Sequence, residues 1–148
     1  MHSFVSCLMH VVFSTKDRRP FITPGIQEHL WPYIGGIAKG NQMRALQVGG
    51  IEDHVHVLLS LPSTLAIAKA VQLIKGNSSK WIHETFPELR AFEWQEGYGA
   101  FSISVSGIKD TTVYIENQSE HHRRKSFKDE LKQILKKHEI QYEDWMLD

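Results

Sequence analysis

The first candidate for chemistry is a pair of histidines, His54 and His56, separated by one valine. They lie in a short apolar stretch that follows Gly49 and Gly50 and ends at Pro62, which predicts a strand. Successive side chains on a strand point to opposite faces, so the two imidazoles share a face and lie roughly 7 Å apart. Two neutral imidazoles at that spacing can bind one metal ion and leave coordination positions open for catalysis. The same pair also occurs on the polar face of an ordinary half-buried strand, so a metal site needs further ligands.

Tyr114 is the candidate nucleophile, because it alone among the four tyrosines has a ligand-type side chain one helical turn away. That side chain is Gln118, and both residues fall on one face of a helix predicted over residues 106–118. The competing interpretation of Tyr114 is a core aromatic. The helix contains a Thr-Thr-Val sequence of poor helix formers, so its order is expected to depend on docking.

Clusters of basic residues are candidate contacts for phosphate groups. Three cations stand beside two hydroxyls in the loop after the first predicted strand, and two lysines flank a small polar segment, residues 76–79. A third cluster follows the tyrosine helix. Each cluster can equally be a solvated surface, and for residues 75–80 a simple helix break competes. The candidate residues are Lys16, Arg18, Arg19, Lys75, Lys80, His121, Arg123, Arg124 and Lys125.

The 148 residues suit a single domain, spanning 1–148, with one sizeable core. With 41% hydrophobic and 23% charged residues, the composition is typical of a globular protein. No apolar run reaches the ~20 residues that span a bilayer, and the N-terminal residues lack the pattern of a secretion signal. The single cysteine, Cys7, cannot form an internal disulfide, so we expect a cytoplasmic protein. Basic and acidic residues number 17 each, so net charge neither favours nor excludes nucleic acid as a partner.

Hydrophobic periodicity and turn residues predict the elements that position these side chains. The two strands around the glycine pair are joined closely enough to form an antiparallel hairpin. The element order predicts an α+β fold, a ferredoxin-like or RRM-like antiparallel sheet with helices packed mainly on one face. The predicted strands are residues 5–13, 43–48, 55–61, 92–95 and 100–104. The predicted helices are residues 24–40 with a kink or break at Pro32, 63–86 interrupted at 75–80, 106–118, and a final helix capped by Ser126.

Several stretches together resemble one family, the single-tyrosine HUH transposases of the smallest bacterial insertion sequences, which include the REP-associated tyrosine transposases. The stretches follow one another in the family's order and extend over nearly the whole chain. The His-hydrophobic-His element alone would not be specific, but the combination is. The matching stretches are residues 10–16, 53–56, 75–81, 94–102, 114–118 and 120–123.

The resemblance implies a metal-dependent strand transferase that cleaves and rejoins single-stranded DNA at hairpin-marked ends through a 5′-phosphotyrosine. It implies that Tyr114 is the nucleophile, that His54, His56 and Gln118 bind the metal, and that the basic clusters contact DNA. It further implies Mg²⁺ or Mn²⁺ as cofactor, whereas imidazole ligands by themselves suit Mn²⁺ or Zn²⁺ better than Mg²⁺. The family also implies a homodimer in which the tyrosine helix of one subunit completes the histidine site of the other.

Two alternatives belong to other classes of protein. One is a domesticated, non-catalytic protein that holds hairpin DNA or RNA or processes palindromes without transposition; the set of four site residues disfavours pure binding. The other is a phosphoesterase with paired His-x-Thr/Ser motifs. Here Val57 follows His56 and no second motif of that type occurs, so the phosphoesterase resemblance fails.

Overall fold

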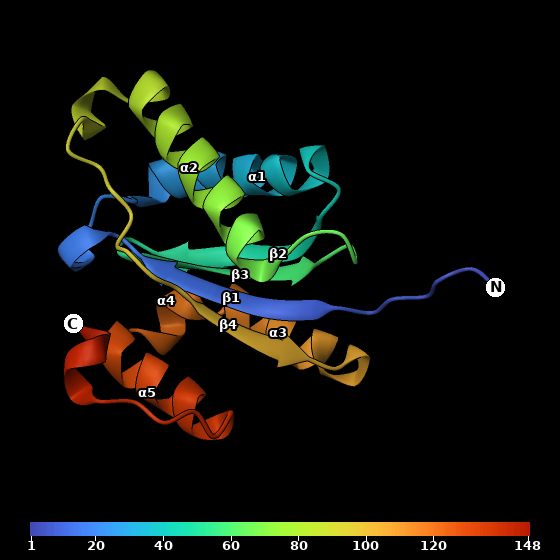
Figure 1. Ribbon diagram of the computed structural model, residues 1–148. Helices are drawn as coiled ribbons and strands as arrows, with labels where there is room; N and C mark the ends of the chain where they lie inside the picture. Colours follow the sequence, from blue (N-terminus) through green and yellow to red (C-terminus); the bar gives the residue numbers. More distant parts are fainter.

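A four-stranded antiparallel sheet forms the centre of the protein, in a computed structural model that describes residues 1–148 (Figure 1). The strand order across the sheet is β2-β3-β1-β4, so the strand that carries the two histidines is an inner one. The α+β class and the antiparallel sheet predicted from the sequence are confirmed. The strands are β1 (Leu8–Ser14), β2 (Arg44–Ile51), β3 (His54–Ser60) and β4 (Gly99–Ile103).

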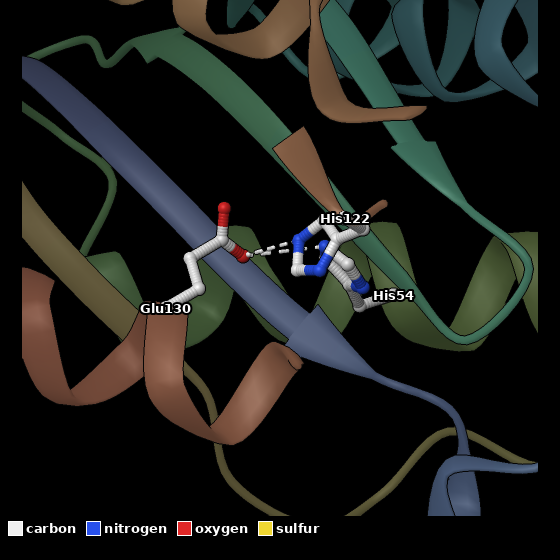
Figure 2. Close-up of side chains that lie close together, drawn as sticks. All are labelled: His54, His122 and Glu130. Carbon is white, nitrogen blue, oxygen red and sulfur yellow. Dashed lines mark hydrogen bonds and ion pairs between the residues drawn. The ribbon is translucent and has the colours of Figure 1, made fainter. Parts of the chain in front are cut away.

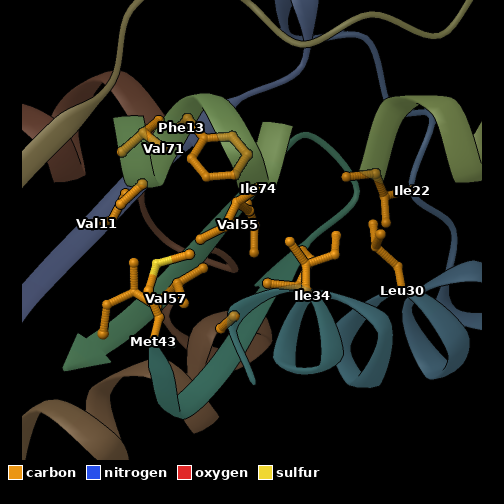
Figure 3. Packing of buried hydrophobic residues seen from close by; sticks show 14 of the residues in the cluster. Val11, Phe13, Ile22, Leu30, Ile34, Met43, Val55, Val57, Val71 and Ile74 are labelled. Atoms are coloured by element: carbon orange, nitrogen blue, oxygen red, sulfur yellow. The ribbon is translucent and has the colours of Figure 1, made fainter. Parts of the chain in front are cut away.

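Alternation along β3 divides its side chains between the two faces of the sheet. Val55, Val57 and Leu59 belong to the main hydrophobic core, in which Figure 3 shows two of them beside residues of the long helices. His54 and His56 belong to the opposite face and are opposite Ser14 and Val12 of β1 in the antiparallel register. The strand pattern predicted for the histidine pair is therefore confirmed, and both imidazoles leave the main core.

Two long helices, α1 (Pro24–Gly40) and α2 (Ile67–Thr85), cover the core face of the sheet (Figure 1). The break expected at Pro32 is wrong: α1 continues through the proline, since Ile26, Leu30 and Ile34 are buried along one stripe that docks on the core. The proline removes one backbone donor, and the stripe of buried residues on both sides of it maintains the helix.

The interruption expected at residues 75–80 is also wrong, because α2 is continuous there. Its polar side chains hydrogen-bond back to the helix: Ser78 Oγ donates to the Ile74 carbonyl at 2.6 Å, and Asn77 Nδ2 donates to the Leu73 carbonyl at 2.9 Å. These bonds follow the i to i−4 pattern and leave the backbone ladder intact. Ser78 and Ile74 are both buried, so this segment packs inward.

Three shorter helices cover the other face of the sheet, where the histidines lie (Figure 1). They are α3 (Ile108–Glu116), α4 (Gln118–His121) and α5 (Phe127–Lys137). The predicted helix over 106–118 thus divides into α3 and α4, and the predicted cap is confirmed, since Ser126 Oγ accepts a hydrogen bond from the Asp129 backbone amide. The larger core lies on one face as predicted, but helices cover both faces. The sheet is therefore enclosed around its histidines.

The remaining elements are short. The strand expected over 92–95 is wrong; only an isolated bridge joins Trp94 to Thr15. No helix has the length and apolar character needed to cross a membrane. Four 3-10 segments complete the structure: Lys16–Arg18, Pro87–Leu89, Val105–Gly107 and Asp144–Leu147.

Candidate active site

His54 and His56 lie side by side on β3 and are completely buried, each with 0% exposed area. Their ring centroids are 5.0 Å apart. Each ring is held from behind through Nδ1: Asp53 Oδ1 lies 2.7 Å from Nδ1 of His54, and His10 Nε2 lies 2.8 Å from Nδ1 of His56. A partner on one ring nitrogen orients the ring and leaves the other nitrogen for a ligand, an arrangement usual for metal-binding histidines. Both Nε2 atoms face the same carboxylate, that of Glu130.

Glu130, on α5, occupies the middle of the site and is 1% exposed. Its Oε1 lies 3.3 Å from Nε2 of His54, 3.1 Å from Nε2 of His56 and 3.1 Å from Nε2 of His122. Figure 2 shows the carboxylate pointing from α5 towards the rings of His54 and His122. The sequence analysis missed both Glu130 and His122.

A signal for Glu130 was present in the sequence. It stands three residues after Phe127 and four before Ile134, which places it on the apolar stripe of an amphipathic helix. Phe127 is buried and stacks on the ring of His54, with ring centroids 4.5 Å apart. A carboxylate on such a stripe requires a buried polar partner, and the histidines provide it.

Tyr114 and Gln118 reach the same carboxylate from the other side. The Tyr114 hydroxyl donates a hydrogen bond to Oε2 of Glu130, and Gln118 Nε2 donates to the same oxygen at 3.0 Å. Gln118 Oε1 lies 3.0 Å from Nε2 of His54, and the ring centroid of Tyr114 lies 5.7 Å from that of His56. One chain therefore brings together the four residues that the sequence singled out, with the tyrosine and the histidines in the same protomer.

The pKa values of these groups follow from burial and from their contacts with Glu130. Burial lowers the pKa of His56, whereas for His54 the hydrogen bonds with Asp53 and Glu130 outweigh burial and raise the pKa to about 9. Burial alone would raise the pKa of Glu130, but its hydrogen bonds with the three histidines hold it far below the usual range. Burial and the adjacent Glu130 carboxylate raise the pKa of Tyr114. The site thus contains an ionised carboxylate and a protonated phenol.

The donor set fits a divalent cation. His54, His122 and Glu130 offer ligand atoms that all lie within 4.8 Å of one another. The contacts of Glu130 Oε1 with the histidine nitrogens, and of Gln118 Oε1 with His54, span 3.0 to 3.3 Å. Adjacent ligands of one ion are separated by about 3 Å when the bonds to that ion are about 2.1 Å long. The cluster is therefore a possible metal site.

The predicted basic residues are distributed over both faces. Lys75 and Lys80 lie on α2, on the face away from the histidines, and Lys75 Nζ donates to the Gln95 and Gly97 carbonyls at 2.6 and 2.9 Å. Lys16 pairs with Glu93 at 3.1 Å. In the first loop, Arg18 donates to the Leu147 carbonyl and lies over the Phe127 ring, and Arg19 lies over the Phe21 ring.

The basic run after α3 lies next to the site. The ring centroid of His121 is 5.2 Å from that of Tyr114, and its Nε2 is buried with no hydrogen-bond partner. Arg123 pairs with Glu120 at 3.4 Å, and Lys125 donates to Gln133. Arg124 is exposed and makes no ion pair.

The largest hollow of the surface lies beside the histidine cluster, with a volume of about 600 Å³. Arg18, Tyr98 and Phe127 are among the residues that line it, between the turn before β4 and the first turn of α5. Tyr98 is 44% exposed there. An aromatic ring and a guanidinium at one hollow offer the contacts that an unpaired nucleotide base needs.

Comparisons with known proteins agree with this geometry. The family described as "Transposase IS200 like" matches residues 3–118. The transposase for insertion sequence element IS200 of Salmonella typhimurium strain LT2 is 26% identical over 125 residues, which cover 80% of this chain and 81% of the relative. The ISDra2 transposase TnpA of Deinococcus radiodurans is 25% identical over 114 residues, covering 74% of this chain and 81% of the relative.

Two solved structures share the fold. A putative transposase from Deinococcus radiodurans R1 superimposes with a TM-score of 0.66 at 24% identity, covering 80% of this chain and 95% of the other. A REP-associated tyrosine transposase bound to a REP hairpin superimposes with a TM-score of 0.60 at 14% identity, covering 82% and 72%. The family match extends over more than half of the chain and includes His54, His56, Tyr114 and Gln118. The chain therefore belongs to the IS200-like transposase family.

Proposed function

We propose that this transposase cleaves and rejoins single-stranded DNA at hairpin-marked ends through a 5′-phosphotyrosine, and that it depends on a divalent cation. The observation that carries the proposal is the convergence of Tyr114, Gln118 and both histidines on one buried carboxylate within a single chain. A protein that only bound DNA would not need a phenol and three metal-type ligands at one point.

Tyr114 is the proposed nucleophile. Its phenol oxygen attacks the scissile phosphorus and forms a tyrosine–phosphate ester, while the bond from phosphorus to the 3′ oxygen breaks. The phenol loses its proton and the 3′ oxygen gains one, so the DNA is left with a 3′-OH. The ester conserves the bond energy, and a second 3′-OH can attack it in the reverse reaction without ATP. Cleavage and rejoining are thus one reaction in two directions.

His54, His56 and Gln118 are the proposed protein ligands of the cation, for which Mg²⁺ or Mn²⁺ is the expected identity. When bound, the cation supplies Lewis-acid polarisation of the scissile phosphate. The chain itself contributes orientation: Asp53 and His10 hold the backs of the two imidazoles. Gln118 donates to Glu130 as well as facing His54, which fixes the direction of its amide oxygen.

The DNA is expected to approach from the side of Tyr114 and His121, because both side chains are only partly buried whereas the two histidines of β3 are inaccessible. His121 Nε2 has no partner in the protein and lies next to the nucleophile, so it is suited to a phosphate oxygen. Arg123, Arg124 and Lys125 continue the basic run and are proposed contacts for the DNA backbone. The hairpin bound to the REP-associated relative supports a hairpin as the substrate.

A homodimer remains part of the proposal. In the structure Tyr114 contacts Glu130 of its own chain, so a site shared between subunits requires α3 of one protomer to replace that of its partner. The short helices of this region are separated by the junctions at Asn117 and residues 122–126, where such an exchange would have to begin.

A covalent-adduct assay tests the proposed function. The protein is incubated with single-stranded DNA from the ends that flank its own gene, with Mn²⁺ or Mg²⁺, and separated on a denaturing gel. The wild type should form a 5′ adduct, and Tyr114→Phe should form none while binding the hairpin as before. Tyr33→Phe is the matched control, because Tyr33 lies on α1 and stacks on Trp81 with ring centroids 4.4 Å apart, away from the site.

An adduct in the Tyr114→Phe variant would refute the assignment of the nucleophile. Hairpin binding by the wild type without any adduct would instead identify a non-catalytic, domesticated binding protein. Zn²⁺ as the only active metal would refute the expected cofactor.

A further inference from the structure

Glu130 is the most highly connected side chain of the site, and the family match does not account for it. The match ends at residue 118, whereas Glu130 lies on α5, which begins at Phe127. Its carboxylate is 1% exposed and therefore depends on protein groups or a bound ion to balance its charge.

The two oxygens of Glu130 have separate partners. Oε1 faces only imidazoles, with the Nε2 atoms of His54, His56 and His122 at 3.1 to 3.3 Å. Oε2 accepts hydrogen bonds from the Tyr114 hydroxyl and from Gln118 Nε2. One oxygen therefore lies among metal-type ligands, and the other holds the nucleophile and the amide.

The imidazoles of His54 and His56 can use only their Nε2 atoms towards a cation. Their Nδ1 atoms are engaged by Asp53 and His10, at 2.7 and 2.8 Å. A cation bound by both Nε2 atoms must lie in the space that these atoms face, and Oε1 of Glu130 is in contact with both. Any ion held by the pair is thus within reach of the carboxylate.

Charge gives the second reason. Two neutral imidazoles and an amide oxygen form an uncharged ligand set, and Mg²⁺ and Mn²⁺ prefer oxygen ligands, above all carboxylates. We infer that Glu130 is the anionic ligand of the divalent cation, binding it through Oε1 beside His54 and His56 while Oε2 keeps its hold on Tyr114. This inference rests on the proposed function and adds a residue to its metal site. It makes one carboxylate the link between the cation, the nucleophile and α5.

The test measures Mn²⁺ binding without DNA, by isothermal titration and by the loss of the free Mn²⁺ signal in electron paramagnetic resonance. Glu130→Gln removes the charge and keeps the shape, and should weaken Mn²⁺ binding about tenfold or more. Asp129→Asn is the matched control: Asp129 is the preceding residue on α5, is exposed and makes no ion pair. It should change the affinity by less than about twofold. His56→Ala reports on the proposed metal site itself.

The outcomes separate the inference from the proposed function. Loss of binding in His56→Ala together with full binding in Glu130→Gln would overturn the inference and leave the metal site in place. A wild type that binds no Mn²⁺ would overturn both. A crystal structure of the wild type with Mn²⁺ needs no variant, and so serves if Glu130→Gln does not fold, as judged by circular dichroism. The anomalous peak should lie at bonding distance from a Glu130 oxygen, and a peak bound only by the histidines and Gln118 would refute the inference.

Discussion

Gly49→Ala is the substitution by which the structure most directly tests the placement of the tyrosine helix. Gly49 lies on β2 where α3 crosses it, and a Cβ at this position would lie 2.7 Å from the Ile115 carbonyl oxygen and 2.9 Å from Ile115 Cγ2. Ile115 is 1% exposed and directly follows Tyr114. The nearest atom is backbone, so a side-chain rotation cannot relieve the contact.

The size of the effect follows from these distances. Ordinary van der Waals contact begins at 3.4 Å, so α3 or β2 must move by about 0.7 Å (3.4 minus 2.7) to accept the methyl group. Overpacking of this kind costs about 1–3 kcal/mol of unfolding free energy. Displacement of a reacting group by about 1 Å can lower a rate by about a hundredfold. We therefore expect adduct formation to slow by between about tenfold and a hundredfold, with a melting temperature lower by several degrees.

The assay combines single-turnover adduct formation with thermal unfolding followed by circular dichroism. Gly36→Ala is the control, because a Cβ at Gly36, on α1, meets no atom within 4 Å. Alanine also favours a helix over glycine by up to about 1 kcal/mol, so this variant should melt at the same temperature or higher and react at the normal rate. If Gly49→Ala reacted and melted like the wild type, α3 would not pack on β2 as described, and the argument for the position of Tyr114 would fail.

Two further predictions concern assembly and DNA binding. Mixing the inactive variants Tyr114→Phe and His56→Ala should restore about a quarter of wild-type activity if subunits of a homodimer share their sites, since half of the dimers are then mixed and each has one intact site; no recovery would show that each site lies within one chain. Hairpin binding should weaken steeply with salt, and Arg124→Ala should reduce the slope of log K against log salt by roughly 0.7–0.9. Lys39→Ala, on the last turn of α1, is the control and should leave the slope unchanged; equal slopes for wild type and Arg124→Ala would argue against a phosphate contact at Arg124.

Features that depend on local spacing were predictable from the sequence. Alternation along residues 54–60 places both histidines on one face, and the structure confirms it. The four-residue spacing of Tyr114 and Gln118 brings both side chains to Glu130, although the helix between them divides. The hydroxyl of Ser126 caps α5 as expected. Each of these follows from neighbours within about one turn or one strand.

Where tertiary packing outweighs local preference, the sequence was misleading. Pro32 and the Gly-Asn-Ser-Ser segment at 76–79 are unfavourable within helices, yet both helices continue. Buried stripes at helical spacing stabilise them against the core by more than these residues cost.

Sequence periodicity identified the polar face of the strand and the stripe of the last helix, and the transposase family followed from motifs spread along the chain. Only the tertiary structure decided that these two surfaces meet. Glu130 is 74 residues from His56, and His10 is 46 residues from it. Periodicity reports which residues of one element share a face but not which faces pack together, because packing depends on how the whole chain satisfies its buried surfaces at once. The carboxylate at the centre of the site is therefore a result of the fold.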